Sequence, residues 1–109
     1  MSGPDRNDDR VLFNFVDGAG RLLGIPVQRK KRLVVLRWLA EDFQPGRLYP
    51  EAELNRIISR RHPDFAALRR HLVDEEIMQR RYAVYWRTGS VANVGHDPPS
   101  WQDGGQVQP

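Results

Sequence analysis

Apolar residues fall in separate runs along the chain, and the spacing within each run predicts an element. The first run, Val11 to Val16 (VLFNFV), is short; a turn signal, DGAG at residues 17–20, follows before the apolar pattern resumes at residues 21–25. A run this short fits a hairpin or a short helix that leads into the turn. We favour the helix, over residues 9–16.

The clearest helical pattern covers residues 28–43, and Gln44-Pro45-Gly46 ends it. Its apolar side chains recur every three or four residues, so they share one face. They are Leu33, Leu36, Leu39, Ala40 and Phe43, with Val35 and Trp38 widening the face. Four cations, Arg29, Lys30, Lys31 and Arg32, stand in the first turn, where the helix dipole disfavours positive charge. This cluster fits either a phosphate-contacting patch or a solvated helix start.

Two further helices are predicted with a very short connection between them. The first begins at Tyr49-Pro50, with proline in the first helical position. It ends at Arg60-Arg61-His62, because Pro63 disfavours helical geometry in the residue before it. Asp64 can then cap the next helix by accepting from backbone donors of its first turn. A connection of three or four residues forces the helices into contact, which is helix-turn-helix geometry.

The helix after Asp64 has two distinct faces. Its core face carries Phe65, Leu68 and Leu72, flanked by Val73. The opposite face, which would enter a major groove, carries Ala67, Arg70, His71 and Asp74. Arg69 projects between the faces, so we expect its stem to pack and its head to seek a carboxylate. Arg69 is therefore expected to be structural, and Arg70 to be the contact residue.

The last patterned segment alternates. Tyr82, Val84 and Trp86 fall on every second position, and a period of two predicts a half-buried strand. We expect these three side chains to pack on the helix before it. Residues 77–81 can pair with this strand as a hairpin, the wing. No Gly, Asn or Asp separates the two runs, so any wing must be very short or irregular.

Together these elements predict one domain that is mainly α with a small β element, of the winged helix-turn-helix-like class. At 109 residues the chain has enough material for one small core and not for two. We place the domain at residues 11–88. Residues 1–10 and 89–109 are expected to be disordered tails, because they offer little apolar surface to offset the entropy of ordering.

Composition narrows the function classes. The chain has 17 basic and 14 acidic residues, for a net charge of +3, and all but two of the basic residues are arginines, whose planar fork suits phosphates and carboxylates. The lack of cysteine excludes disulfides, zinc–thiolate sites and thiol nucleophiles. The start has no signal-peptide pattern, and no apolar run approaches the roughly 18 residues of a membrane span. We expect a cytoplasmic protein that does not contact membranes.

Catalysis has little support in the sequence. His62, Asp64 and His71 are metal-capable, but no HExxH-like spacing is present, and a cap role for Asp64 with histidines on the polar surface explains them better. No Ser or Thr lies in a nucleophile elbow, and no Gly-rich phosphate loop precedes a helix. We expect neither an enzyme nor a bound cofactor or metal.

Binding of duplex DNA has more support. The candidate contacts are Arg29, Lys30, Lys31, Arg56, Arg60, Arg61, Arg70, His71, Arg80 and Arg81. Phosphate contacts would position the protein, and side chains of the inserted helix would read bases. That helix has no Asn or Gln for adenine and is followed by acids that repel phosphate, which argues against strong sequence readout.

A protein-interaction or regulatory module without catalysis is the alternative. In that case Tyr82, Tyr85 and Trp86 would form an aromatic contact strip, since aromatic and arginine side chains are enriched at protein interfaces. The partner would be a second copy of the chain, as a homodimer, or another regulatory protein.

Four sequence blocks also stand in a specific order. They are DGAGRLLGIP, QRKKRLVVLRWLAEDFQPGRLYPEAELNRII, HPDFAALRRHLVDE and the final YWR. From about Val16 to Arg87 the chain thereby resembles the bacterial domain-of-unknown-function 2087 family. The resemblance implies a winged-helix relative, similar to modules attached to bacterial transcription regulators, and hence a role in regulation.

Three departures from the family pattern are visible. Pro50 stands where the family prefers a hydroxyl cap, His71 stands where an acid is usual, and the hairpin loop lacks its Gly-bearing turn. These changes bear on contacts made by loops more than on the fold.

Overall fold

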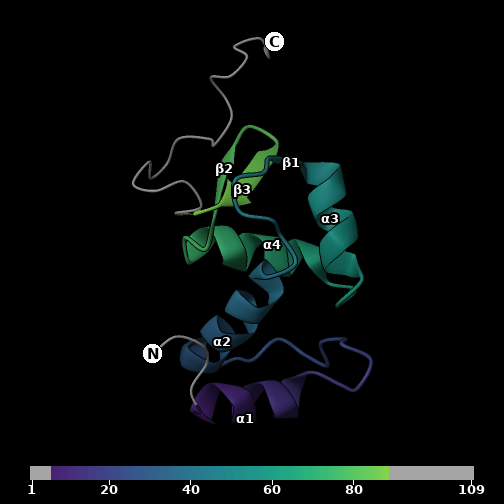
Figure 1. The fold of residues 1–109 in the computed structure, drawn as a ribbon, viewed down its shortest axis with the longest axis vertical. Coiled ribbons are helices and arrows are strands. Elements are labelled where there is room, and N and C mark those ends of the chain that lie inside the picture. The colour runs from purple at the N-terminus through teal and green to yellow at the C-terminus, as the bar shows by residue number, and fades with distance from the viewer. Residues whose placement is uncertain (1–5, 89–109) are drawn as a thin grey trace.

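The structure, a computed structural model that describes residues 6–88, consists of four helices and a small sheet (Figure 1). The helices are α1 (Arg6–Phe15), α2 (Arg29–Ala40), α3 (Glu51–Ser59) and α4 (Phe65–Asp74). The strands are β1 (Tyr49–Pro50), β2 (Met78–Arg81) and β3 (Val84–Arg87). The preference for a helix at residues 9–16 is confirmed by α1. This helix begins inside the segment expected to be a tail, and the expected tail at 89–109 lies outside the described residues.

The three strands form one antiparallel sheet in the order β1-β3-β2. The alternating pattern predicted β2 and β3, whereas β1 was expected to be the start of a helix. Pro50 extends the chain before α3 begins at Glu51, and it pairs with Val84 at the sheet edge. An edge position suits proline, which has no N–H to donate. Two residues are too few to show periodicity, so only the pairing partner reveals β1.

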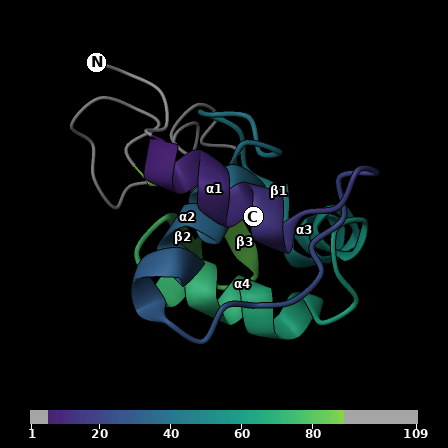
Figure 2. The same ribbon diagram turned by 90° about the horizontal axis from the view of Figure 1, so that it is seen from below.

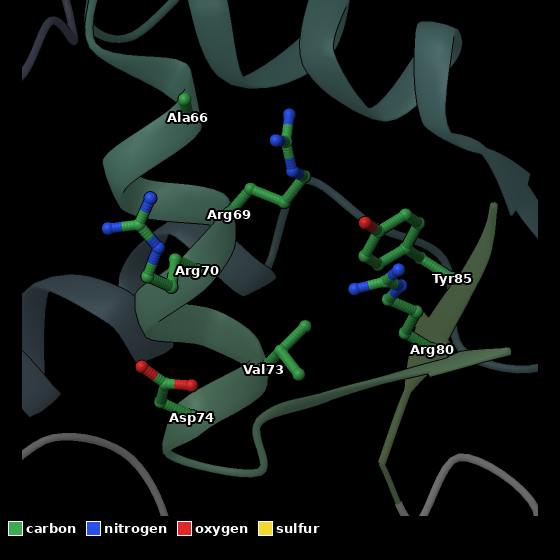
Figure 3. A pocket seen from close by; sticks show the side chains of 7 residues that line it. All are labelled: Ala66, Arg69, Arg70, Val73, Asp74, Arg80 and Tyr85. Atoms are coloured by element: carbon green, nitrogen blue, oxygen red, sulfur yellow. The ribbon is translucent and has the colours of Figure 1, made fainter. Parts of the chain in front are cut away.

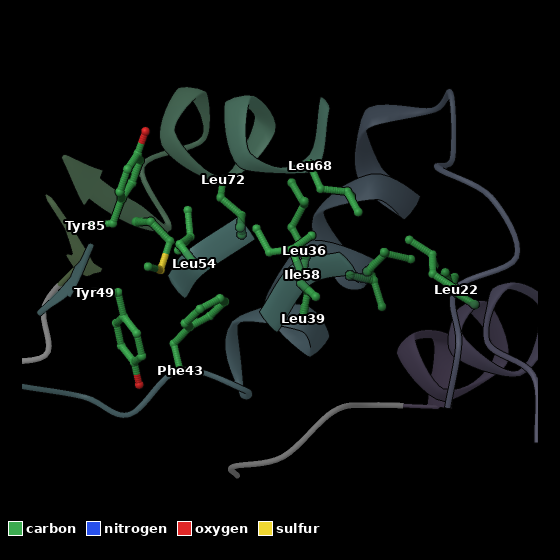
Figure 4. Close-up of a cluster of buried hydrophobic side chains, with 14 residues drawn as sticks. Leu22, Leu36, Leu39, Phe43, Tyr49, Leu54, Ile58, Leu68, Leu72 and Tyr85 are labelled. Atoms are coloured by element: carbon green, nitrogen blue, oxygen red, sulfur yellow. The ribbon is translucent and has the colours of Figure 1, made fainter. Parts of the chain in front are cut away.

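Side chains of α2 lie at the centre of the core. Leu36 and Leu39 are fully buried, and α3, α4 and the sheet close around them (Figure 4). The side chains that these elements contribute include Leu54, Ile58, Leu68, Leu72, Met78, Tyr49 and Tyr85. The helix α1 packs against α2 through Val11, at the other end of the molecule from the sheet (Figure 1).

The end of α4 is a Schellman motif, in which two backbone N–H groups close the last turn. The N–H of Ile77 donates to the carbonyl of Leu72 at 2.9 Å, and that of Glu76 donates to Val73 at 3.0 Å. Glu76 therefore takes the left-handed position that such caps require, with φ of 59°. Together with Asp64, whose carboxylate accepts from the N–H of Ala67 as predicted, this motif sets the length of α4 and points the chain into β2.

The hairpin turn is as short as the sequence predicted, but the side chains that it directs into the core are not the predicted ones. Tyr82 and Ala83 form a two-residue turn between β2 and β3, so Tyr82 is not in a strand and its side chain is 83% exposed. Tyr85 packs into the main core in its place, opposite Arg80 on β2. The expectation that Tyr82, Val84 and Trp86 pack together was therefore wrong for Tyr82, which lies in the turn. Trp86 is buried, but it lies on the face of β3 opposite to Tyr85, which belongs to the main core.

The arrangement agrees with the winged helix-turn-helix-like class: helix, short strand, two helices in contact, and a hairpin that completes the sheet. Within residues 6–88, no helix is long and apolar enough to cross a membrane.

Candidate nucleic-acid interface

The outward face of α4 and the β2–β3 hairpin enclose a small pocket of about 160 Å³ (Figure 3). Burial of Leu68 and Leu72 sets the rotation of α4, so Arg70 is exposed on the opposite side, as predicted. Arg80 lies on the facing strand. The lining residues are Ala66, Arg69, Arg70, Val73, Asp74, Arg80 and Tyr85. Three arginines against one aspartate make this pocket cationic.

Hydrogen bonds hold two of the side chains that line the pocket, those of Arg69 and Tyr85. Nη1 of Arg69 donates to Oδ1 of Asn55 on α3 at 2.7 Å, and the hydroxyl of Tyr85 donates to Oε1 of Glu51 at 2.8 Å. Burial, with the bond to Glu51 as the second cause, raises the pKa of Tyr85, so this hydroxyl keeps its proton at neutral pH. The structural role predicted for Arg69 fits this geometry, although its partner is an amide and not a carboxylate.

The hairpin side of the pocket carries exposed cations. Arg80 and Arg81 are both exposed on β2, and Nε of Arg80 donates to the backbone carbonyl of Tyr82 at 2.9 Å. This bond holds the guanidinium of Arg80 next to the turn. Arg80 therefore lies beside the hairpin tip and faces α4 across the pocket, whereas the side chain of Arg81, the next residue of the strand, points to the other face of the sheet.

The first turn of α2 is tied to the end of α4 (Figure 2). The guanidinium of Arg29 forms a two-pronged ion pair with Glu75, with Nη2 at 2.7 Å and Nε at 3.0 Å from the carboxylate oxygens. The bond from Arg29 lowers the pKa of Glu75. Arg32 donates to the backbone carbonyl of Val27 at 2.8 Å. These contacts explain why cations stand at a helix start, where the dipole disfavours them.

Lys30 and Lys31 remain exposed beside this tied turn. They line a groove of about 490 Å³ between α1 and α2, together with Arg37 and the apolar Val11 and Val34. Of the three candidates from this helix, Arg29 is thus committed to Glu75, whereas the two lysines stay open to solvent.

Arg61, another of the predicted contact residues, is held within the fold. Its guanidinium pairs with both oxygens of Asp42, at 2.7 and 2.8 Å, and Nη1 donates to the carbonyl of Gly20 at 2.7 Å. It also lies 5.0 Å from the ring centre of Trp38. The bond to Asp42 raises the pKa of Arg61. Within the fold, Arg61 thus joins the end of α3 to Asp42 and to the turn at Gly20.

The turn at residues 17–21 is shaped to receive Arg61. Oδ1 of Asp17 accepts from the N–H groups of Ala19 and Arg21, both at 2.9 Å. Gly20 has φ of +80°, and a side-chain carbon there would come within 2.7 Å of Nη1 of Arg61. The turn that the sequence predicts at residues 17–20 is thus a contact site for Arg61, which follows the end of α3.

The remaining candidates lie around the helix-turn-helix. Arg56 is exposed on α3, and the side chain of Arg60 is exposed, while its backbone carbonyl accepts from Arg21 at 2.9 Å. His71 is half-buried at the edge of α4 nearest Glu75. In the described part of the chain, Arg70 and Arg80 thus meet at one pocket although they come from different elements, whereas Lys30 and Lys31 share the α1–α2 groove, and Arg60 and Arg61 share a hollow beside Asp42.

The sequence allowed two positions for Tyr82, in the core or in an aromatic surface strip, and it did not single out Arg69 as a pocket residue. The missing turn residues between β2 and β3 were a signal for Tyr82, since a hairpin that short must place some side chain at its tip. No local signal marked Asn55 as the partner of Arg69. His62 and Asp64, considered as metal ligands, instead shape the α3–α4 turn, where Nδ1 of His62 accepts from the N–H of Asp64 at 3.0 Å.

Comparison with known proteins adds one finding. No curated protein and no solved structure matches this chain. A family model described as "Uncharacterized protein conserved in bacteria (DUF2087)" matches residues 21–87. The match begins at the turn that receives Arg61, includes the three strands and the pocket of Arg70 and Arg80, and ends with β3. The chain belongs to the DUF2087 family.

Proposed function

We propose that this chain is a non-catalytic DNA-binding domain of a bacterial transcription regulator, with α4 and the β2–β3 hairpin as its contact surface. The observation that carries the proposal is the pairing of Arg70 on α4 with Arg80 on β2 across the cationic pocket. Two arginines on separate elements, both turned to one opening, suit the phosphates of a nucleic-acid backbone.

Backbone contact is a better fit than base reading. The outward side of α4 offers Arg70 as its cation, while Asp74 and Glu76 stand at the end of the helix and are exposed. Acids there repel phosphate and would keep the end of α4 out of a deep groove. We therefore propose binding that is strongly dependent on salt and only weakly dependent on sequence.

The test measures fluorescence anisotropy of a labelled random duplex as a function of salt. We expect affinity to fall steeply as salt rises, by a slope of about 0.9 for each phosphate neutralised. Arg70→Ala and Arg80→Ala should each weaken binding several-fold and lower the slope by about 1. Arg37→Ala is the matched control, since Arg37 is an equally exposed arginine that lines the separate α1–α2 groove.

Two results would count against this function. One is weak binding of the wild-type chain even at low salt. The other is an equal loss in all three variants, because it would mean that net charge and not the pocket attracts DNA.

A second candidate, self-association, is supported by a different surface. Phe13, Leu23 and Val27 are 84%, 63% and 93% exposed, and all lie in α1 or in the segment that joins it to α2. The expected aromatic strip does not form, because Tyr85 and Trp86 are buried. Contiguous exposed apolar side chains mark contact surfaces, and we propose that these three contribute to one such patch.

Light scattering after size-exclusion chromatography tests this candidate. A homodimer that Phe13→Ser or Leu23→Ser converts to monomer would support it. A wild-type chain that stays monomeric at high micromolar concentration would refute it.

A further inference from the structure

The tip of the β2–β3 hairpin holds a tyrosine in a backbone conformation that tyrosine disfavours. Tyr82 has φ of 56°, in the left-handed region, at the first position of a two-residue turn. Gly and Asn are the residues that hairpins use at such positions, because a larger side chain crowds the backbone there. The chain therefore gives up stability at this position.

Packing does not explain the tyrosine. Its side chain is 83% exposed, so the ring contributes almost no contact that would offset the unfavourable backbone. Among residues 6–88, the other non-glycine residue with positive φ is Glu76, which has a structural reason, since it closes the Schellman motif of α4. Strained residues that the fold does not need occur most often where a chain contacts a ligand.

The surroundings of Tyr82 indicate the chemistry of that ligand. Arg80 and Arg81 precede it, both exposed, and Nε of Arg80 donates to the Tyr82 carbonyl at 2.9 Å. An exposed aromatic ring close to arginines is the combination that proteins use for single-stranded nucleic acid: the cations contact phosphates and the ring stacks on a base.

We propose that Tyr82 stacks on a base whose face is uncovered, so that the domain prefers DNA with a single-stranded overhang to a fully paired duplex. This inference rests on the proposed DNA binding. In the interior of a paired duplex both faces of each base are covered by neighbours, and a ring meets only edges and sugars. A blunt end uncovers one face of its last pair, whereas the unpaired bases of an overhang can also turn their faces towards the ring. At a junction one face is open, and a two-residue turn is narrow enough to bring the ring against it.

The experiment compares one labelled duplex with blunt ends and the same duplex with a short 3′ overhang. The wild-type chain should bind the overhang form roughly tenfold more tightly, as expected for one stacked base. Tyr82→Phe keeps the ring and should keep this ratio. Tyr82→Gly and Tyr82→Asn should bring the ratio close to one.

Thermal unfolding of the same variants supplies a second readout. Tyr82→Gly should raise Tm by roughly 4–8 °C, because glycine adopts the positive φ without crowding. A residue kept for stability would change Tm in the opposite direction. Glu76→Gly is the matched control: it relieves the same conformation at the end of α4, and should raise Tm while leaving the overhang ratio unchanged.

The outcomes separate this inference from the proposed function. Salt-dependent duplex binding with a ratio of one would overturn the inference and leave the function in place. A ratio that survives in Tyr82→Gly would also overturn it, because the ring would not be its source. Failure to bind any DNA would overturn both.

Discussion

Individual arginines in this domain have different roles, and the role of each depends on the groups with which its side chain forms hydrogen bonds. The side chain of Arg61 donates three hydrogen bonds to two residues: to both carboxylate oxygens of Asp42 and to the carbonyl of Gly20. Arg60, the preceding residue, exposes its side chain. The two are equal in the sequence, but Arg61 joins the end of α3 to two other segments, and Arg60 contributes only its backbone to such a contact.

Arg61→Ala should therefore destabilise the domain by about 2 kcal/mol, since it removes charged hydrogen bonds and leaves Asp42 without its partner. Urea unfolding measures the effect, with Arg60→Ala as the control. We expect Arg60→Ala to change the free energy of unfolding by less than about 0.5 kcal/mol, as is usual for an exposed side chain. Equal effects in the two variants would contradict the structural assignment of Arg61.

At the scale of elements, an ion pair connects the start of α2 with the end of α4. Arg29 and Glu75 are 46 positions apart in the chain, and their contact holds two helices that have opposite roles, one central to the core and one facing the pocket. Because the bond from Arg29 lowers the pKa of Glu75, the folded domain binds a proton at this carboxylate less readily than the unfolded chain does.

This difference predicts how acid affects the connection. The stabilisation is fully present above the pKa of an unfolded glutamate, about 4.3, and is lost as the pH falls through the lower folded-state value. Glu75→Gln should therefore lower Tm at pH 6, and the gap to the wild type should shrink as the pH approaches 3. Glu76→Gln removes the neighbouring exposed carboxylate as a control. A gap of constant size across this pH range would refute the role of the ion pair.

At the scale of the whole molecule, local signals predicted most of the elements. Pro63 and Asp64 placed the boundary between α3 and α4, and the apolar spacing of residues 28–43 predicted α2. These signals act over a few residues, so the sequence carries them completely. The strand β1 was not predicted, and neither was the face of β3 that meets the main core. Both depend on pairing between Tyr49 and Tyr85, which lie far apart in the chain.

The candidate site was predictable only in part, for the same reason. Arg70 was correctly placed on the outward face, since the helical period relates it directly to Leu68 and Leu72. Its neighbour across the pocket, Arg80, comes from another element, and only the packing of the hairpin against α4 brings the two together.

The sequence by itself determined where the helices begin and end, which face of α4 is buried, and that the hairpin turn is short. The tertiary structure decided which cations remain available to a ligand. Arg29, Arg61 and Arg69 find their side-chain partners 46, 19 and 14 positions away, whereas Arg70 faces solvent. A long, flexible side chain reaches whichever acceptor the packed elements bring near it, and that choice is made by segments remote in the sequence.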